Sequence, residues 1–168
     1  MDCGSIMRPI RSKLYVDDLT LTAIDFMMEK HMGLVPVVDR HECFAGLISG
    51  DRIMHHLLPK HLTMVRGLDR MSYLRESREE LLERLEDLGQ TTIGEIMDCH
   101  ADVVYPDTAL VEVYKTLSGS QFVVPVVEKE TRKLLGAISF FTILAILRDE
   151  EAWSDRVEKG GMDAQGGA

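Results

Sequence analysis

Val123-Val124-Pro125-Val126-Val127-Glu128, followed by Gly136-Ala137-Ile138-Ser139, has a counterpart earlier in the chain. The earlier copy is Leu34-Val35-Pro36-Val37-Val38-Asp39, followed by Gly46-Leu47-Ile48-Ser49. Short apolar, β-branched runs bounded by turn residues are typical of buried strands. Each copy therefore predicts two buried strands joined by a polar turn, with a serine where the second strand gives way to a helix. The expected strands are 34–38 and 44–49 in the first copy and 122–127 and 134–138 in the second, where a short strand at 103–104 precedes them.

The correspondence extends beyond these strands. Residues 90 positions apart are identical in several places: Ile6 and Ile96, Met7 and Met97, Tyr15 and Tyr105, Asp17 and Asp107, Gly46 and Gly136, and Ser49 and Ser139. The prolines Pro36 and Pro125 are 89 positions apart, a slip of one residue that a loop absorbs. A repeat of this period indicates a tandem duplication.

Composition and charge narrow the function classes. The chain has 168 residues, of which 45% are hydrophobic and 28% charged, as in ordinary globular proteins. A formal net charge of -9 opposes binding to the phosphate backbone of nucleic acids. No apolar run approaches the roughly 20 residues of a membrane span, and the N-terminus lacks the features of a secretory signal. We therefore expect a cytoplasmic protein that binds neither nucleic acid nor membranes.

Cysteine and histidine form no recognisable metal motif. Cys3, Cys43 and Cys99 fit neither a zinc pattern nor a disulfide framework, and we expect reduced, mostly buried thiols. His55 and His56 would point about 100° apart on a helix, which favours surface histidines over metal ligands. We expect no metal site, and we find no Walker loop or Ser/His/Asp spacing that would indicate an enzyme.

Four helices are expected within the repeats. One spans residues 19–32, with Asp17 as N-cap and Gly33 at its end. Its counterpart spans 109–117, with Asp107 or Thr108 as N-cap and a break at Gly119. The other two follow Ser49 and Ser139 and end near residues 58 and 147. A serine at such a junction is an N-cap, and the same geometry offers backbone N–H groups to an anion, so both interpretations stay open.

The segment between the repeats, residues 59–90, has a different character. Residues 75–88 are rich in Glu, Arg and Leu and predict a helix with a leucine seam, closed by Gly89. Such a helix either packs on the body of the protein or forms a dimer contact. We expect the domain order 1–58 first repeat, 59–90 helical connector, 91–148 second repeat and 149–168 tail, with disorder after residue 158.

Each repeat resembles a CBS domain, and the pair resembles a Bateman module of the stand-alone bacterial type. The resemblance rests on the apolar-Pro-Val-Val-acid strand, the Gly-x-x-Ser switch and the helix preceded by Asp. It implies an α+β fold in which two β-α-β-β-α units pack around a pseudo-twofold axis, commonly as a homodimer. It also implies adenine nucleotides or related ligands in clefts between the units, with a regulatory rather than catalytic role.

The family's switch motif reads Gly-x-x-Thr/Ser-x-x-Asp/Asn, and its last acid typically binds ribose hydroxyls. Arg52 and Thr142 replace that acid here, while Asp51 lies one position early. A guanidinium cannot accept hydrogen bonds and suits phosphate or carboxylate instead. The resemblance thus implies these candidate ligand-binding residues: Leu14, Val35, Pro36, Ser49, Asp51, Arg52, Val104, Val124, Pro125, Ser139 and Thr142.

These observations leave three candidate functions. The first is a regulatory module that senses AMP, ADP, ATP or a related anionic metabolite and acts on a separate protein target. The second is a structural dimerisation scaffold with degenerate clefts. The third, an enzyme, has no supporting motif in the sequence.

Overall fold

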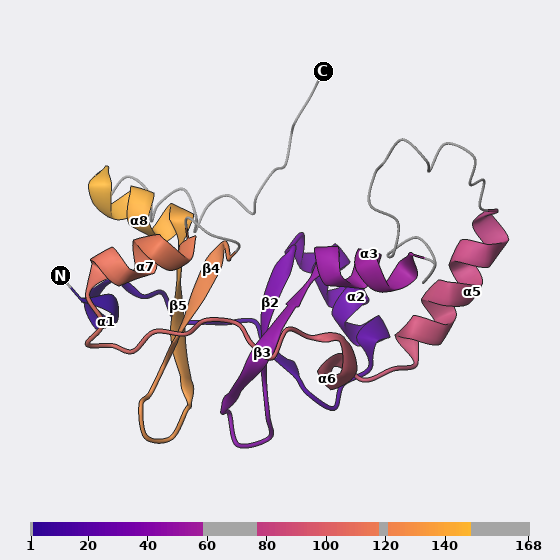
Figure 1. The fold of residues 1–168 in the computed structure, drawn as a ribbon, viewed down its shortest axis with the longest axis horizontal. Helices are drawn as coiled ribbons and strands as arrows, with labels where there is room; N and C mark the ends of the chain where they lie inside the picture. Colours follow the sequence, from indigo (N-terminus) through magenta and orange to yellow (C-terminus); the bar gives the residue numbers. More distant parts are fainter. Residues whose placement is uncertain (1, 59–76, 118–120, 149–168) are drawn as a thin grey trace. The chain divides into compact units, whose positions relative to one another are not determined.

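The computed structural model describes residues 2–58, 77–117 and 121–148, which fall into two compact units (Figure 1). The first unit comprises Ser12–His100. The second combines the residues before Ser12 with those from Ala101 onward. This division differs from the consecutive order expected from the sequence, because residues 2–11 fold with the second repeat and residues 91–100 with the first.

The described residues of the first unit form one mixed sheet and four helices. Its elements, in chain order, are β1 (Leu14–Tyr15), α2 (Thr20–Lys30), β2 (Leu34–Val38), β3 (Phe44–Ser49), α3 (Gly50–Leu57), α5 (Arg78–Gly89) and α6 (Ile93–Ile96). The strand order is β1-β2-β3, with β1 parallel and β3 antiparallel to the central strand β2. The predicted strands 34–38 and 44–49 are therefore confirmed.

The second unit repeats this plan with a shorter first strand. Its elements are α1 (Cys3–Ile6), α7 (Leu110–Leu117), β4 (Val123–Val127), β5 (Leu134–Ser139) and α8 (Phe140–Leu147). β4 and β5 are antiparallel, and Val104 forms a single parallel bridge with Val126 where a strand at 103–104 was expected. The predicted α+β class, with two tandem units of one kind, is confirmed.

A short segment completes each sheet, and it comes from the start of the other repeat. In the first unit Leu47 and Asp98 exchange backbone hydrogen bonds of 3.0 and 2.7 Å. In the second unit Arg8 and Ala137 do the same at 2.9 Å. The segments around Arg8 and Asp98 occupy equivalent places in the repeat, so each covers the outer strand of the hairpin belonging to the other copy. This arrangement protects edges that would otherwise pair with other chains.

Pro36 and Pro125 lie in the middle of buried strands rather than at their ends. The N–H of Val104 donates to the carbonyl of Pro125 at 3.0 Å, and Val127 donates back to Val104 at 2.9 Å. Backbone hydrogen-bonding groups point alternately to the two sides of a strand, so the nitrogen of Pro125 faces the same side as its carbonyl, toward Val104. The hydrogen-bonded pairing with Val104 ends at this carbonyl, so the sheet needs no N–H from the proline. The carbonyl of Pro125 is thus engaged in the sheet.

Two expected helix ends are wrong. Leu19, not Asp17, is the N-cap of α2, and the N–H of Thr20 donates to the carbonyl of Thr91 at 2.8 Å. The helix stops at Lys30 because His31 adopts a left-handed conformation with φ 51°, two residues before Gly33. Neighbouring segments therefore cap α2, which the local sequence does not reveal.

The acids expected as N-caps bind hairpin residues instead. Asp17 pairs with Arg40, and Asp107 pairs with Lys129 at 2.9 Å, so the two repeats use the same contact. Thr108 accepts the N–H of Tyr105 in the turn before α7 at 3.0 Å.

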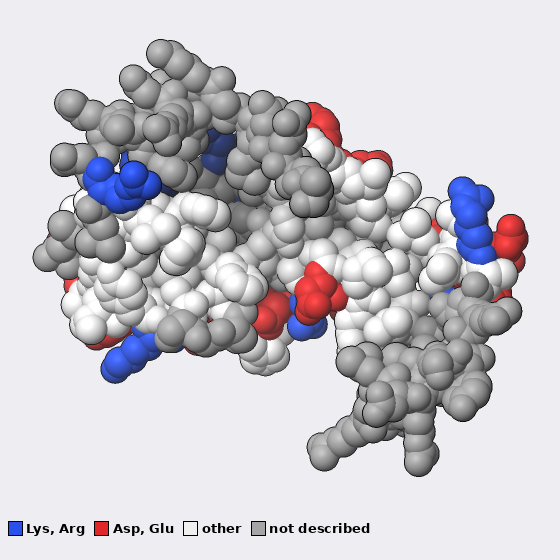
Figure 2. All heavy atoms as spheres, turned by 90° about the horizontal axis from the view of Figure 1, so that it is seen from above, with Lys and Arg blue, Asp and Glu red and all other residues white. Residues whose placement is uncertain are grey.

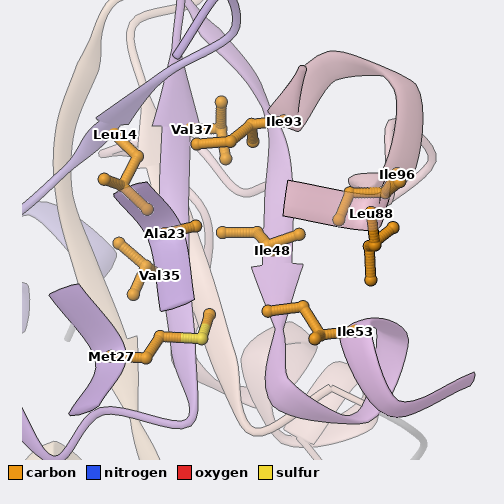
Figure 3. Packing of buried hydrophobic residues seen from close by; sticks show 10 residues of the cluster. All are labelled: Leu14, Ala23, Met27, Val35, Val37, Ile48, Ile53, Leu88, Ile93 and Ile96. Carbon is orange, nitrogen blue, oxygen red and sulfur yellow. The ribbon is translucent and has the colours of Figure 1, made fainter. Parts of the chain in front are cut away.

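The connector helix belongs to the first unit. α5 begins after Ser77, which forms a capping box with Glu80, rather than at residue 75. Its Leu88 joins the buried core that also holds Val35, Val37 and Ile48, from the two central strands (Figure 3). Residues 59–76, the expected break at Gly119 and the expected tail from 149 lie outside the described residues.

Candidate ligand-binding sites

The expected ligand sites lie at two helix openings, the N-termini of α3 and α8, which Ser49 and Ser139 cap. In the first unit Ser49 ends β3 and is the N-cap of α3. Its Oγ accepts the backbone N–H of Arg52 at 3.2 Å. Ser49 is half-buried, and Asp51 in the first turn is exposed. The other backbone N–H groups of the first turn make this end of the helix electropositive.

Arg52 has a fixed position at this opening. Its Nε donates to the backbone oxygen of Ile96 at 2.7 Å, at the end of the short helix α6. The side chain is half-buried. A guanidinium carries five N–H donors in a planar arrangement, so one bond to Ile96 orients the group and leaves further donors. One turn further, burial and then the charge of Arg52 lower the pKa of His56.

The corresponding opening in the second unit is closed by its own side chains. Ser139 Oγ accepts the N–H of Thr142 at 3.2 Å, and Thr142 Oγ1 accepts the N–H of Ser139 at 3.2 Å. The two hydroxyl oxygens are 3.1 Å apart, and Thr142 is only 7% exposed. This reciprocal cap occupies both hydroxyl groups, so the two units differ chemically at equivalent positions.

The remaining candidate residues are apolar and lie in the cores. Leu14 and Val35 are buried in the first unit, as are Val104 and Val124 in the second. Pro36 and Pro125 are buried as well. Their side chains pack against other core residues, so any ligand contact by these residues would involve backbone atoms. Their part in ligand binding stays a prediction.

Two surface hollows lie at the hairpin turns, away from the serine openings. One, of about 380 Å³, is lined by Tyr15, Asp17, Asp18, Arg40 and Glu42. The other, of about 330 Å³, is lined by Pro106, Asp107, Glu128, Lys129, Glu130 and Leu135. A hydrogen bond from Arg40 lowers the pKa of Asp17, and one from Lys129 lowers that of Asp107. Arg40 and Lys129 of the hairpin turns are thus already paired with carboxylates of the segments that precede α2 and α7.

The sequence did not reveal what the motif glycines do. A β-carbon on Gly46 would lie 2.5 Å from the backbone oxygen of Asp98, and one on Gly136 would lie 2.7 Å from that of Arg8. The glycines therefore allow the lead-in segments to approach the sheets. Their recurrence in the Gly-x-x-Ser motif was the available signal, but the approaching segment is far away in the sequence.

Other site types find no support in the described residues. No group of three or more His, Cys, Asp or Glu side chains within residues 2–58, 77–117 and 121–148 is placed to hold a metal ion. The three cysteines, all within these ranges, form no disulfide. Cys3 is buried as expected, but Cys43 is half-buried and Cys99 is exposed. No described helix is both long and apolar enough to cross a membrane.

Comparison with known proteins agrees with this architecture. The family model of the CBS domain matches residues 93–149. No curated protein matches the chain. Among solved structures, a CBS domain-containing protein of unknown function from Bacillus anthracis str. Ames Ancestor shares 15% identity, with 88% of this chain and 92% of that chain covered and a TM-score of 0.66.

Two further structures show the same likeness. A CBS domain-containing protein of unknown function from Kribbella flavida DSM 17836 shares 16% identity over 89% of this chain and 99% of its own, with a TM-score of 0.66. CBSX2 in complex with AMP shares 19% identity over 87% of this chain and 95% of its own, with a TM-score of 0.63. The family model thus identifies residues 93–149 as a CBS domain. The solved structures show that the chain as a whole has the fold of a tandem pair of CBS domains.

Proposed function

We propose that the protein is a non-catalytic regulatory module that senses an adenine nucleotide or a related anionic metabolite at the Ser49 opening. The observation that carries the proposal is the Arg52 guanidinium, held beside the start of α3 by its bond to Ile96. A fixed guanidinium and a helix N-terminus both favour a phosphate or carboxylate group. Because Arg52 cannot accept hydrogen bonds from ribose hydroxyls, recognition through the anionic part of the ligand takes precedence.

The helix opening of the second unit is less suited to bind an anion, which favours a single anion site at Ser49. The hydroxyl groups of Ser139 and Thr142 bond each other's backbone N–H groups, and no cation stands at the third position of α8. An anion at this opening would have to displace an internal cap worth about 0.5–2 kcal/mol. We therefore assign ligand sensing to the first unit.

The comparisons agree with a ligand-binding role. The similar structure of CBSX2 contains AMP, and this chain shares its fold over most of both lengths. We further propose that the protein acts as a cytoplasmic homodimer and passes the ligand signal to a separate protein target. The alternative is a dimerisation scaffold without a ligand, which the closed cap of the second unit favours.

A thermal-shift and calorimetry panel tests the proposal. ATP, ADP, AMP, NADH, S-adenosylmethionine and cyclic dinucleotides are added to the purified full chain, because a ligand of the folded state raises the unfolding midpoint by mass action. For the ligand that binds, Arg52→Gln should weaken affinity about 10-fold or more, as loss of a charge-assisted hydrogen bond does. Arg40→Gln, at the far end of the hairpin, is the matched control.

Two outcomes contradict the proposal. If none of these compounds raises the midpoint or gives a calorimetric signal, the scaffold alternative stands. If a ligand binds wild type and Arg52→Gln equally, binding occurs elsewhere. The unfolding midpoint of each variant without ligand shows whether loss of the bond to Ile96 has altered the fold itself. Turnover of a nucleotide by the protein, lost on changing Ser49 or Ser139, would revive an enzymatic role.

A further inference from the structure

Two connections join the end of β3 and the start of α3 to one short segment, residues 96–98. Through the backbone, Leu47 and Asp98 exchange hydrogen bonds of 3.0 and 2.7 Å. Through a side chain, Arg52 Nε donates to the carbonyl of Ile96 at 2.7 Å. The two connections close a ring within the first unit, so a displacement of Arg52 removes one of the two attachments of the 96–98 segment.

The carbonyl of Ile96 depends on this side-chain bond. Ile96 is the last residue of α6, where backbone carbonyls have no partner within the helix. Its side chain is 3% exposed and packs in the core beside Leu88 (Figure 3). In the described part of the chain this carbonyl accepts no other hydrogen bond outside α6. Without Arg52, a buried residue would therefore carry an unpaired acceptor, which is unfavourable.

The second unit has no equivalent of the bond from Arg52 to Ile96. Thr142 stands at the position of Arg52, 90 residues later, and Ile6 stands at that of Ile96, 90 residues earlier. The hydroxyl of Thr142 lies 3.1 Å from that of Ser139 and is engaged there. The corresponding segment of the second unit therefore keeps its backbone pair without a bond from this helix position.

The bond to Ile96 leaves part of the Arg52 guanidinium for an anion. Nε is the engaged atom, and among the described residues the Nη1 and Nη2 groups have no hydrogen-bond partner. Two guanidinium N–H groups fit two oxygens of one phosphate or carboxylate. On the face drawn in Figure 2, the described cations lie singly or in small groups without an extended basic area, so anion binding depends on such local donors. One guanidinium can thus hold Ile96 and an anion together.

We propose that an anion bound to the Nη groups of Arg52 holds the guanidinium in place and thereby fastens the 96–98 segment to the first unit, an arrangement that we call the Arg52 link. This proposal rests on the sensing site proposed above and specifies how that site transmits its signal. The two interactions share one side chain, so each favours the other, and such coupling is reciprocal. The segment ends shortly before Ala101, where the chain enters the second unit.

Amide hydrogen exchange of the full chain, followed by NMR, tests the Arg52 link first without any ligand. Arg52→Gln should speed exchange at the amides of Leu47 and Asp98 about 5-fold or more, because exchange of these paired amides requires local opening. Arg40→Gln is the matched control, since it removes the same group from an exposed position of the same unit. It should leave both rates unchanged.

Inorganic phosphate is then added to wild type as the probe, until its effect levels off. It should slow exchange at Leu47 and Asp98 about 5-fold or more. The amides of Arg8 and Ala137, which form the matching pair of the second unit, should stay unchanged and report any general stabilisation by salt. In Arg52→Gln, phosphate should protect neither pair.

The outcomes separate the Arg52 link from the proposed function. Exchange at Leu47 and Asp98 that is unchanged in Arg52→Gln overturns the link and leaves an anion site at Arg52 standing. Phosphate that protects both pairs equally, or neither pair, overturns the coupling between anion and link. The nucleotide panel above decides separately whether the protein senses a ligand. The phosphate measurement uses wild type, so it decides the coupling even if Arg52→Gln unfolds the first unit.

Discussion

The backbone oxygen of Asp98 lies against Gly46 so closely that a β-carbon on the glycine would come within 2.5 Å of it. The same relationship joins Arg8 and Gly136 at 2.7 Å. In both units the contact accompanies a pair of backbone hydrogen bonds, which fix the lead-in segment to the outer strand of the hairpin. Glycine at these positions therefore decides whether residues distant in the sequence can complete the sheet.

Gly46→Ala is expected to destabilise the fold by about 1–3 kcal/mol, because the added methyl group forces the backbone of Asp98 away. Gly33→Ala is the matched control, since a β-carbon at Gly33 meets no atom within 4 Å. Its stability should stay equal or rise slightly as the unfolded chain loses freedom. Urea unfolding of the two variants measures the difference. Equal midpoints would contradict the close approach of Asp98.

Leu88→Ala should cost about 2–5 kcal/mol, because Leu88 attaches α5 to the core of the first unit and its removal leaves a cavity. Leu81→Ala, on the same helix, removes a side chain that is 42% exposed and should cost less than about 1 kcal/mol. The two changes have the same chemistry, so their difference reports burial alone. A similar cost for both would show that α5 does not pack on this core.

Thr142→Val should destabilise the second unit by about 0.5–2 kcal/mol, although the side chains have nearly the same shape. The change leaves the N–H of Ser139 without the hydroxyl that now accepts it. Thr22→Val, on the exposed side of α2, is the control for the intrinsic effect of the substitution. Thermal unfolding followed by circular dichroism compares the two. If they behave alike, the reciprocal cap contributes nothing to stability.

Burial raises the pKa of Cys3 to about 11 from its ordinary value of 9.0. The unfolded chain therefore releases this proton at lower pH than the folded chain, and stability falls as pH rises from 9 toward 11, by up to about 2–3 kcal/mol. Urea unfolding at pH 8 and pH 10.5 measures the loss, which Cys3→Ala should reduce. An equally steep loss in that variant would assign the effect to other groups.

Much of the fold could be predicted because the apolar strands leave few alternatives. The four long strands differ from their expected ranges by at most one residue, and the helices after Ser49 and Ser139 begin where the serine caps indicated. Helix ends were less predictable. Asp is a residue type that favours N-cap positions, yet Asp17 pairs with Arg40, a residue of the hairpin turn.

The candidate site could be predicted only in part from the sequence. The Gly-x-x-Ser motif indicates Ser49 and Arg52, and these residues do meet at one helix opening. The bond from Arg52 to Ile96 could not be anticipated, since it joins residues 44 positions apart. The sequence also did not reveal that Ser139 and Thr142 cap each other's backbone N–H groups in the second unit, where Thr142 is buried.

The sequence by itself determined the duplication, the strand pairs and the serine-led helices, because alternating burial and capping act between near neighbours. Only the tertiary structure decided which lead-in segment completes which sheet. Backbone hydrogen bonds form between any residue types, so the side chains of Asp98 and Arg8 do not indicate their partners. The pairing of Asp98 with Leu47 and of Arg8 with Ala137 depends on how the chain folds and on the close approach that Gly46 and Gly136 allow.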